Sequence, residues 1–380
     1  MKTRLPYAPD YVTYPGCMIG DLLEELEISA RELARRCGRS AKMISELIAG
    51  KAALEPETAL QLERVLKVDA RIWLNAEAEY RLRLACQLEG DCLSGQADWL
   101  ERFPIDELRS RGYLSSSSVV STQIRDLLKF FGVGSIAACD DKFSEIHSVA
   151  FRHSPTFASR EAALLAWLRV GEIEAQKLAA TDYNRAGFLD ALRTARTLTN
   201  RSVAEALPDV LRLCRNSGVA LVIEPAFSKV ALSGASRWLS PRQALIQQTL
   251  RHKTNDHFWF TFFHEAAHIL LHSRKYIFID GDAADDQTID QETEANTWAS
   301  NFLIPEAELT KFIVHNEILE DSVRSFAEMR GIAPAIVVGQ LQHRKVIGFG
   351  QLNRLKERLD VDQLTAMIRA ISAGQAESLT

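Results

Sequence analysis

The spacing of apolar residues along the chain predicts a largely helical protein with one short stretch of strands. Apolar positions recur at helical spacing near the N-terminus, through most of residues 86–200 and again after residue 255. From residue 218 the pattern changes to alternation and β-branched residues in "GVALVIEP", "KVALSGASRW" and "QALIQQTL", which predicts three short antiparallel strands. The expected fold class is therefore α+β, mainly α with a small antiparallel β-sheet.

Two short helices separated by a glycine-containing turn are expected near the N-terminus. Ser29 and Ser40 are natural N-caps, Glu32 would complete a capping box with Ser29, and Gly38 interrupts the helical pattern between them. This is the helix-turn-helix pattern, whose second helix reads bases in the major groove. Two further helices, "PETALQLERVLKV" and one around "RIWLNAEAEYRLRLA", complete an all-α domain over residues 1–85.

Positive charge is concentrated on this predicted helix pair. Residues 28–52 contain six basic residues and two glutamates, a net charge of +4, whereas the preceding helix is acidic. Basic side chains in this position favour contact with DNA phosphates. The residues expected to bind DNA are Arg35, Arg39, Ser40, Lys42 and Ser45. The alternative is a purely structural helical bundle with solvated arginines, and Glu46 on the presumed reading face leaves the operator sequence open.

The order of these helices over about residues 14–85 resembles the Xre/HigA-type regulators. The segment "TALQLERVLKVDARIWLNAEAEY" is especially similar to the HigA antitoxin pattern, with Trp73 and Tyr80 in place. The resemblance implies binding to operator DNA as a dimer, often with autoregulation. Operator DNA and a second copy of the chain are therefore expected partners.

The apolar segment "FFHEAAHILLH" carries the strongest chemical signal in the chain. On a helix, His264 and His268 point in the same direction and can bind one metal ion at about 2.0–2.1 Å each. Glu265 would take a proton from a metal-bound water whose pKa the metal lowers to about 7, as in zinc peptidases. A chance occurrence is the alternative, but burying these polar groups in an apolar helix without a partner would be costly. Asn255 and Asp256 are the expected N-cap of this helix.

A third protein ligand is expected from a later helix, within "DQETEANTWASNFLIP". Glu292 lies 24 residues after the second histidine, and Asn296 follows one turn later as an expected hydrogen-bonding partner of a histidine ligand. Glu294 is the alternative ligand, and a solvated acidic helix start is the alternative to both. His272 lies roughly 12 Å along the helix from the first ligand, which favours a supporting or packing role.

The segments "DHFWFTFFHEAAHILLH" and "ETEANTWASNFLIP" together resemble the ImmA/IrrE family of zinc-dependent metallopeptidases, over about residues 200–345. The resemblance implies a zincin-like domain holding one Zn²⁺ and, for some members, cleavage of a single transcriptional repressor. A repressor or antitoxin is therefore the expected protein substrate. The alternative is a non-enzymatic, HigA-like antitoxin or transcription factor that uses the zinc fold as a sensor or scaffold. The predicted strands would offer an edge to a substrate strand or would merely cover the metal-binding helix.

Composition limits the class of protein further. Hydrophobic residues make up 47% and charged residues 25% of the chain, which is ordinary for soluble globular proteins. Neither an 18-residue apolar stretch nor a signal-peptide pattern occurs, so no membrane partner is expected. Six cysteines without C-x-x-C spacing fit a reduced cytoplasmic compartment. The expected organisation is a helix-turn-helix domain (1–85), a helical connecting segment (86–200), a peptidase domain (201–345) and a C-terminal helical tail (346–380).

Overall fold

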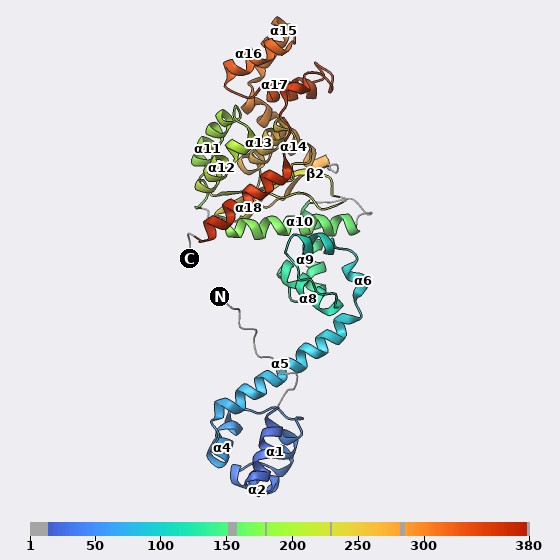
Figure 1. Cartoon of the computed structure of the whole chain (residues 1–380), viewed down its shortest axis with the longest axis vertical. Coiled ribbons are helices and arrows are strands. Elements are labelled where there is room, and N and C mark those ends of the chain that lie inside the picture. Colours follow the sequence, from blue (N-terminus) through green and yellow to red (C-terminus); the bar gives the residue numbers. More distant parts are fainter. Residues whose placement is uncertain (1–13, 151–157, 179–180, 229, 282–285, 378–380) are drawn as a thin grey trace. The chain divides into compact units, whose positions relative to one another are not determined.

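The computed structural model describes residues 14–150, 158–178, 181–228, 230–281 and 286–377 (Figure 1). The expectation of no signal peptide concerns the first residues of the chain, which lie outside these ranges, as does the start of the predicted domain 1–85. The chain forms two compact units. The N-terminal unit comprises the residues up to Ala97 together with Ser118–Ile124, and the C-terminal unit comprises Asp98–Ser117 and the residues from Arg125 onward.

The N-terminal unit is built from helices around one small core. Its helices are α1 (Pro15–Glu25), α2 (Ala30–Cys37), α3 (Ala41–Ile48), α4 (Pro56–Leu66) and α5 (Ala70–Ser94). Each of these helices except the long α5 is short, and all five contribute to the core, whose fully buried members include Ile19, Leu33, Ile44, Leu62 and Trp73. A Cβ atom at Gly16 would lie 2.3 Å from the carbonyl oxygen of Leu47, so only glycine allows α1 to approach the end of α3 this closely.

The two predicted N-caps are present in the helix-turn-helix pair. The side chain of Ser29 accepts a hydrogen bond from the backbone N–H of Glu32, and Ser40 accepts one from Met43. Gly38 ends α2 with a positive φ of 65°, as the turn requires. The capping box predicted for Ser29 is only half formed, because the carboxylate of Glu32 accepts hydrogen bonds from Arg35 and a neighbouring arginine instead.

The C-terminal unit combines helices with a four-stranded sheet. Before the sheet come α6 (Ala97–Leu100), α7 (Ile105–Ser110), α8 (Val120–Phe131), α9 (Ile136–Ala150), α10 (Ala158–Lys177), α11 (Arg185–Leu198) and α12 (Val203–Asn216). Helices α6 and α8 each contain a boundary between the two units, so part of each belongs to the N-terminal unit. The strands and the helix between them are β1 (Val219–Ile223), β2 (Leu232–Ser240), β3 (Gln243–Gln248), α13 (Asn255–Leu271) and β4 (Phe278–Gly281). After them come α14 (Asp286–Leu303), α15 (Glu306–His315), α16 (Glu320–Arg330), α17 (Pro334–His343), the 3₁₀ turn η1 (Asn353–Leu355) and α18 (Val361–Glu377). Within the described ranges, no helix combines the length and apolar character that a membrane crossing requires.

The sheet is mixed, so the expectation of a purely antiparallel sheet was wrong. Its strand order is β1-β3-β2-β4, with β1 parallel to β3 and the other two pairings antiparallel. A tight turn joins β2 to β3, and these two strands pair with each other. Because β3 also pairs with β1, it lies between β2 and β1. The fourth strand, β4, was not predicted, because four residues are too short for a clear alternating pattern.

Helix α13 lies against the sheet and packs on β2, β3, α14 and α17. Its aromatic side chains Trp259, Phe262 and Phe263 are fully buried. The predicted N-cap was wrong: Thr254 holds that position, and Asn255 and Asp256 are buried in the first turn. They bind a segment about a hundred residues later in the chain: Asn255 Oδ1 accepts a hydrogen bond from the backbone N–H of Glu357, and Asp256 forms an ion pair with Lys356. The segment around residues 356–357 is thereby held against the start of α13.

Candidate metal centre and DNA-binding face

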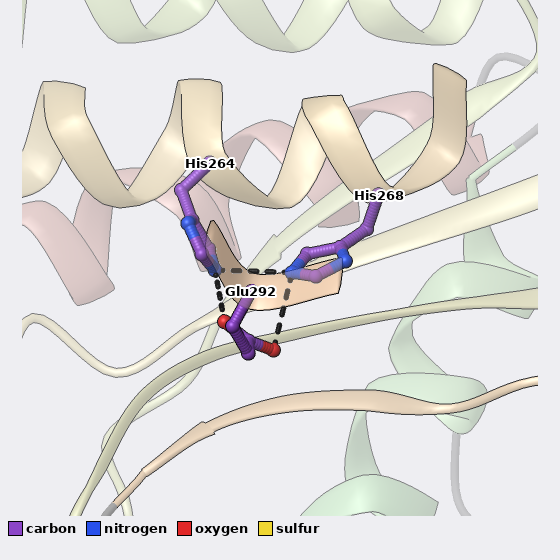
Figure 2. Close-up of side chains that lie close together, drawn as sticks. All are labelled: His264, His268 and Glu292. Carbon is purple, nitrogen blue, oxygen red and sulfur yellow. Dashed lines mark hydrogen bonds and ion pairs between the residues drawn. The ribbon is translucent and has the colours of Figure 1, made fainter. Parts of the chain in front are cut away.

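Three side chains from two helices converge beside the sheet (Figure 2). His264 and His268 of α13 lie one turn apart, with 3.1 Å between their Nε2 atoms. Glu292 of α14 reaches both, with Oε2 3.1 Å from His264 Nε2 and Oε1 3.4 Å from His268 Nε2. Ligand atoms at 2.0–2.1 Å from one tetrahedral zinc ion are about 3.3 Å apart. The observed spacing therefore fits a single ion of this size.

Burial keeps His268 neutral and contacts with the two histidines keep Glu292 ionised, which are the forms that bind a metal. The two histidines are at most 2% exposed. Burial lowers the pKa of His268 to about 4, although its contact with Glu292 acts in the opposite direction. Burial alone would raise the pKa of Glu292, but its contacts with the two histidines outweigh this effect and hold the pKa at about 2. At neutral pH the imidazole is neutral and the carboxylate ionised, as metal binding requires.

A second layer of polar side chains supports His268. Its Nδ1 lies 2.9 Å from Nδ1 of His272, whose Nε2 lies 3.2 Å from Glu294 Oε2. Because the Glu294 carboxylate only accepts, a neutral His272 donates from Nε2 and has an acceptor at Nδ1, so His268 can place its proton on Nδ1. In that tautomer the lone pair of His268 Nε2 faces the Glu292 carboxylate. Two hydrogen-bond acceptors then face each other, and a cation between them would bind to both.

Two residues around the centre were not identified from the sequence. Phe278 of β4 stacks on the ring of His268, with 4.2 Å between ring centroids and 18° between planes, and so fixes the ring's orientation. Gly234 of β2 faces Glu265, which is fully buried. A Cβ atom at Gly234 would lie 2.7 Å from Glu265 Oε1, so the strand leaves room for this carboxylate only because the residue is glycine. No local pattern indicates either role, because both depend on how strands pack on α13.

The structure separates the candidate residues on α14. Glu292 points to the two histidines, whereas the alternative ligand Glu294 contacts His272 and is 61% exposed. Asn296, the expected partner of a histidine ligand, is half-buried, and His272 lies at hydrogen-bond distance from Nδ1 of His268.

In the N-terminal unit, four of the five residues expected to bind DNA are exposed, and three of these four, unlike Ser40, do not cap a helix. Lys42 is 84% exposed and only loosely paired with Glu46, at 3.8 Å. Ser45 lies three residues after Lys42 on α3, about one helical turn further along, and is exposed. Arg35 is 76% exposed, although two of its nitrogens bind Glu32 at 2.7 and 2.9 Å.

The other two residues have structural contacts. Arg39 is 24% exposed, and its Nε donates to Gln61 Oε1 at 2.7 Å, which ties the turn to α4. Ser40 uses its hydroxyl oxygen to cap α3. Of the residues expected to bind DNA, Lys42, Ser45 and Arg35 are therefore the exposed ones that do not cap a helix.

Comparison with known proteins gives two matches that correspond to the two units. A helix-turn-helix family model matches residues 19–73, and the IrrE N-terminal-like domain of peptidase family M78 matches residues 250–327. The uncharacterized HTH-type transcriptional regulator YddM of Escherichia coli strain K12 is 40% identical over 68 residues, which are 18% of this chain and 72% of that protein. Virulence-associated protein A of Dichelobacter nodosus is 35% identical over 71 residues, 18% of this chain and 70% of that protein.

A helix-turn-helix DNA-binding domain and a peptidase-family domain in one chain define a regulator with a peptidase-like domain. By its N-terminal part the chain belongs to the helix-turn-helix regulators, and its C-terminal part carries a peptidase family M78 domain. Both resemblances expected from the sequence are confirmed.

Proposed function

We propose that the protein is a DNA-binding transcriptional regulator whose C-terminal domain is a zinc-dependent peptidase that cleaves a repressor or antitoxin partner. The observation that supports this most directly is the cluster of His264, His268 and Glu292, whose ligand atoms all lie within 4.8 Å of one another. Two imidazoles and one carboxylate are the ligand set of several catalytic zinc sites, which keep a fourth position open for water or substrate.

His264, His268 and Glu292 would hold the ion, which when bound supplies Lewis-acid activation of water and of the scissile carbonyl. Glu265 follows the first ligand on the same helix and is the proposed general base. Its carboxylate would accept a proton from the attacking water and deliver it to the leaving amine. Full burial and the room left by Gly234 restrict Glu265 to a small set of positions, which favours such a role.

The N-terminal unit would bind operator DNA, as a homodimer in the manner implied by its resemblance to the Xre/HigA-type regulators. Exposed Lys42 and Arg35 would contact phosphates, and Ser45 lies where α3 can approach base edges.

The test compares wild type with Glu265→Gln, which preserves shape and hydrogen bonding but cannot accept a proton. We expect about one zinc per purified chain in both proteins by elemental analysis, because Glu265 is not a ligand. In cells, wild type should shorten a repressor encoded nearby and derepress its promoter, whereas the variant should lose this cleavage by about 10²–10⁴-fold.

Glu328→Gln is the matched control, since Glu328 is an exposed carboxylate of α16, a helix that carries none of the proposed ligands. It should behave as wild type. Zinc in both proteins with equal promoter output and no shortened partner in either strain would contradict the peptidase and favour a non-enzymatic regulator that uses the zinc fold as a scaffold.

A further inference from the structure

A cavity of about 780 Å³ lies in the C-terminal unit along strand β1. β1 and β4 are the two outer strands of the described sheet, and Phe278 of β4 stacks on the metal-centre residue His268. Three strand spacings separate the two edges, which amounts to about 14 Å at the usual 4.7–4.9 Å per strand. The cavity is therefore separate from the candidate metal centre.

The cavity runs along the open edge of β1. All five residues of the strand, Val219–Ile223, line it. Side chains of a strand point alternately to its two faces, and those of β1 enter two different hydrophobic clusters. A cavity that touches every consecutive residue must therefore face the strand edge, where backbone groups are not used by β3. The strand is nevertheless at most 4% exposed, because α10, α12 and α18 surround the cavity.

The walls of this cavity are held by hydrogen bonds. On α10, Trp167 Nε1 donates to the carbonyl of Glu224 at 2.9 Å, and Gln247 Nε2 of β3 donates to the carbonyl of Trp167 at 2.7 Å. Arg111 binds the carboxylate of Glu224 at 2.8 Å and the carbonyl oxygen of the next residue at 2.7 Å. These bonds fix the lining residues Arg111 and Glu224, so this part of the wall would lose little conformational entropy when a ligand binds.

Basic side chains outnumber acidic ones around the cavity. The basic residues that line it are Arg111, Lys129, Arg169, Lys177 and Arg215. The acidic residues that line it are Asp126, Glu174 and Glu224.

Each of the three carboxylates is engaged. Glu224 pairs with Arg111, Glu174 accepts from Tyr113 at 2.7 Å and Lys177 at 2.6 Å, and Asp126 accepts from a backbone N–H. Among the residues that the structure describes, Lys129 and Arg215 pair with no carboxylate. These two cations are therefore available to an anionic ligand.

We propose that the cavity binds a small amphipathic anion, whose carboxylate or phosphate head pairs with a cation that has no carboxylate partner among the described residues, Lys129 or Arg215, and whose apolar body lies along β1. Ile173 of α10 and Ile368 and Ile371 of α18 supply apolar walls opposite the strand. The volume lies within the range of about 300–1,000 Å³ that is usual for small-molecule sites. An added peptide strand would use the same edge, but the helices around it and the unmatched cations favour a compact anion.

The test is isothermal titration calorimetry of the full chain, stripped of metal, with octanoate, octyl phosphate and the neutral octanol. We expect one site for at least one of the two anions, and the preferred head group distinguishes carboxylate from phosphate ligands. Octanol should bind at least about tenfold more weakly, since it lacks charge-assisted hydrogen bonds. The double variant Lys129→Gln/Arg215→Gln should weaken anion binding about tenfold or more and leave octanol binding unchanged.

Two further variants control for folding and for nonspecific binding. Arg212→Gln removes a cation of the same helix as Arg215 that does not line the cavity, and it should bind the anion like wild type. Ile173→Trp fills the cavity and should weaken binding of all three probes. The proposal is overturned if neither anion binds at millimolar concentration, if the double variant binds as tightly as wild type, or if an uncharged extended peptide binds more tightly than both anions.

Discussion

Replacement of His272 by alanine tests whether the second layer of polar residues supports the metal centre. His268 is 1% exposed and the side chain of His272 is 4% exposed, so water cannot readily replace the bond of 2.9 Å between their Nδ1 atoms. In the metal-free protein, the His268 ring can carry its proton on Nε2 and donate to Glu292. Metal binding forces the proton onto Nδ1, where His272→Ala leaves no acceptor.

An unsatisfied buried donor costs about 1–3 kcal/mol. At 1.4 kcal/mol per factor of ten, this predicts zinc binding that is about 5- to 150-fold weaker in His272→Ala. The stoichiometry at saturation should stay at one ion per chain, because the three proposed ligands are unchanged. Glu294→Gln should have a smaller effect, since Glu294 is 61% exposed and water can substitute for it.

The assay is competition for zinc with a chromophoric chelator, which gives the dissociation constant of each variant. His272→Gln keeps an acceptor and should recover part of the affinity. His315→Ala is the matched control, because this exposed histidine of α15 contacts a backbone carbonyl of its own helix and none of the proposed ligands in the described part of the chain. A dissociation constant for His272→Ala within twofold of wild type, or a loss in His315→Ala of the same size, would refute the supporting role.

Three other substitutions test separate parts of the structure. Gly234→Ala places a methyl group 2.7 Å from Glu265 Oε1, so peptide cleavage should fall by about 10²-fold while the zinc content stays unchanged. Full cleavage activity in this variant would argue against Glu265 as the general base. Lys356→Met leaves the buried carboxylate of Asp256 without its partner at 2.6 Å, so the free energy of unfolding should fall by about 3–5 kcal/mol. Urea denaturation followed by tryptophan fluorescence measures this change. Additional replacement of Asp256 by leucine should restore stability, and a failure to do so would point to another cause. Lys42→Ala should weaken DNA binding for all sequences and reduce the slope of log K against log salt by about one, and an unchanged slope would remove this lysine from the phosphate contacts.

The helix-turn-helix pair could be predicted almost completely from the sequence. Its boundaries depend on local chemistry: the hydroxyls of Ser29 and Ser40 cap helices within three residues, and Gly38 adopts the left-handed conformation between them. Such interactions need no knowledge of the rest of the fold. The division of the basic residues between exposed and structural roles was not predictable, because Arg39 bonds Gln61, 22 residues further along the chain.

Helix α13 shows the same limit at the candidate metal centre. The pairing of His264 and His268 follows from helical geometry alone, since residues four apart share a face. The choice between Glu292 and Glu294 as their partner was left open by the sequence. Residues two apart on a helix point in nearly opposite directions, so only the rotation of α14 against α13 decides which one faces the histidines.

The features that only the tertiary structure decided all depend on contacts between distant segments. The insertion of β3 between β1 and β2 makes the sheet mixed, and the pairing of β4 with β2 brings Phe278 onto His268. The residues Asn255 and Asp256 resemble an N-cap in sequence but bind a segment about a hundred residues away. Local propensity determines where helices begin and end, whereas the free energy of burial is shared among distant segments, so strand partners and site neighbours are determined only when the whole core is packed.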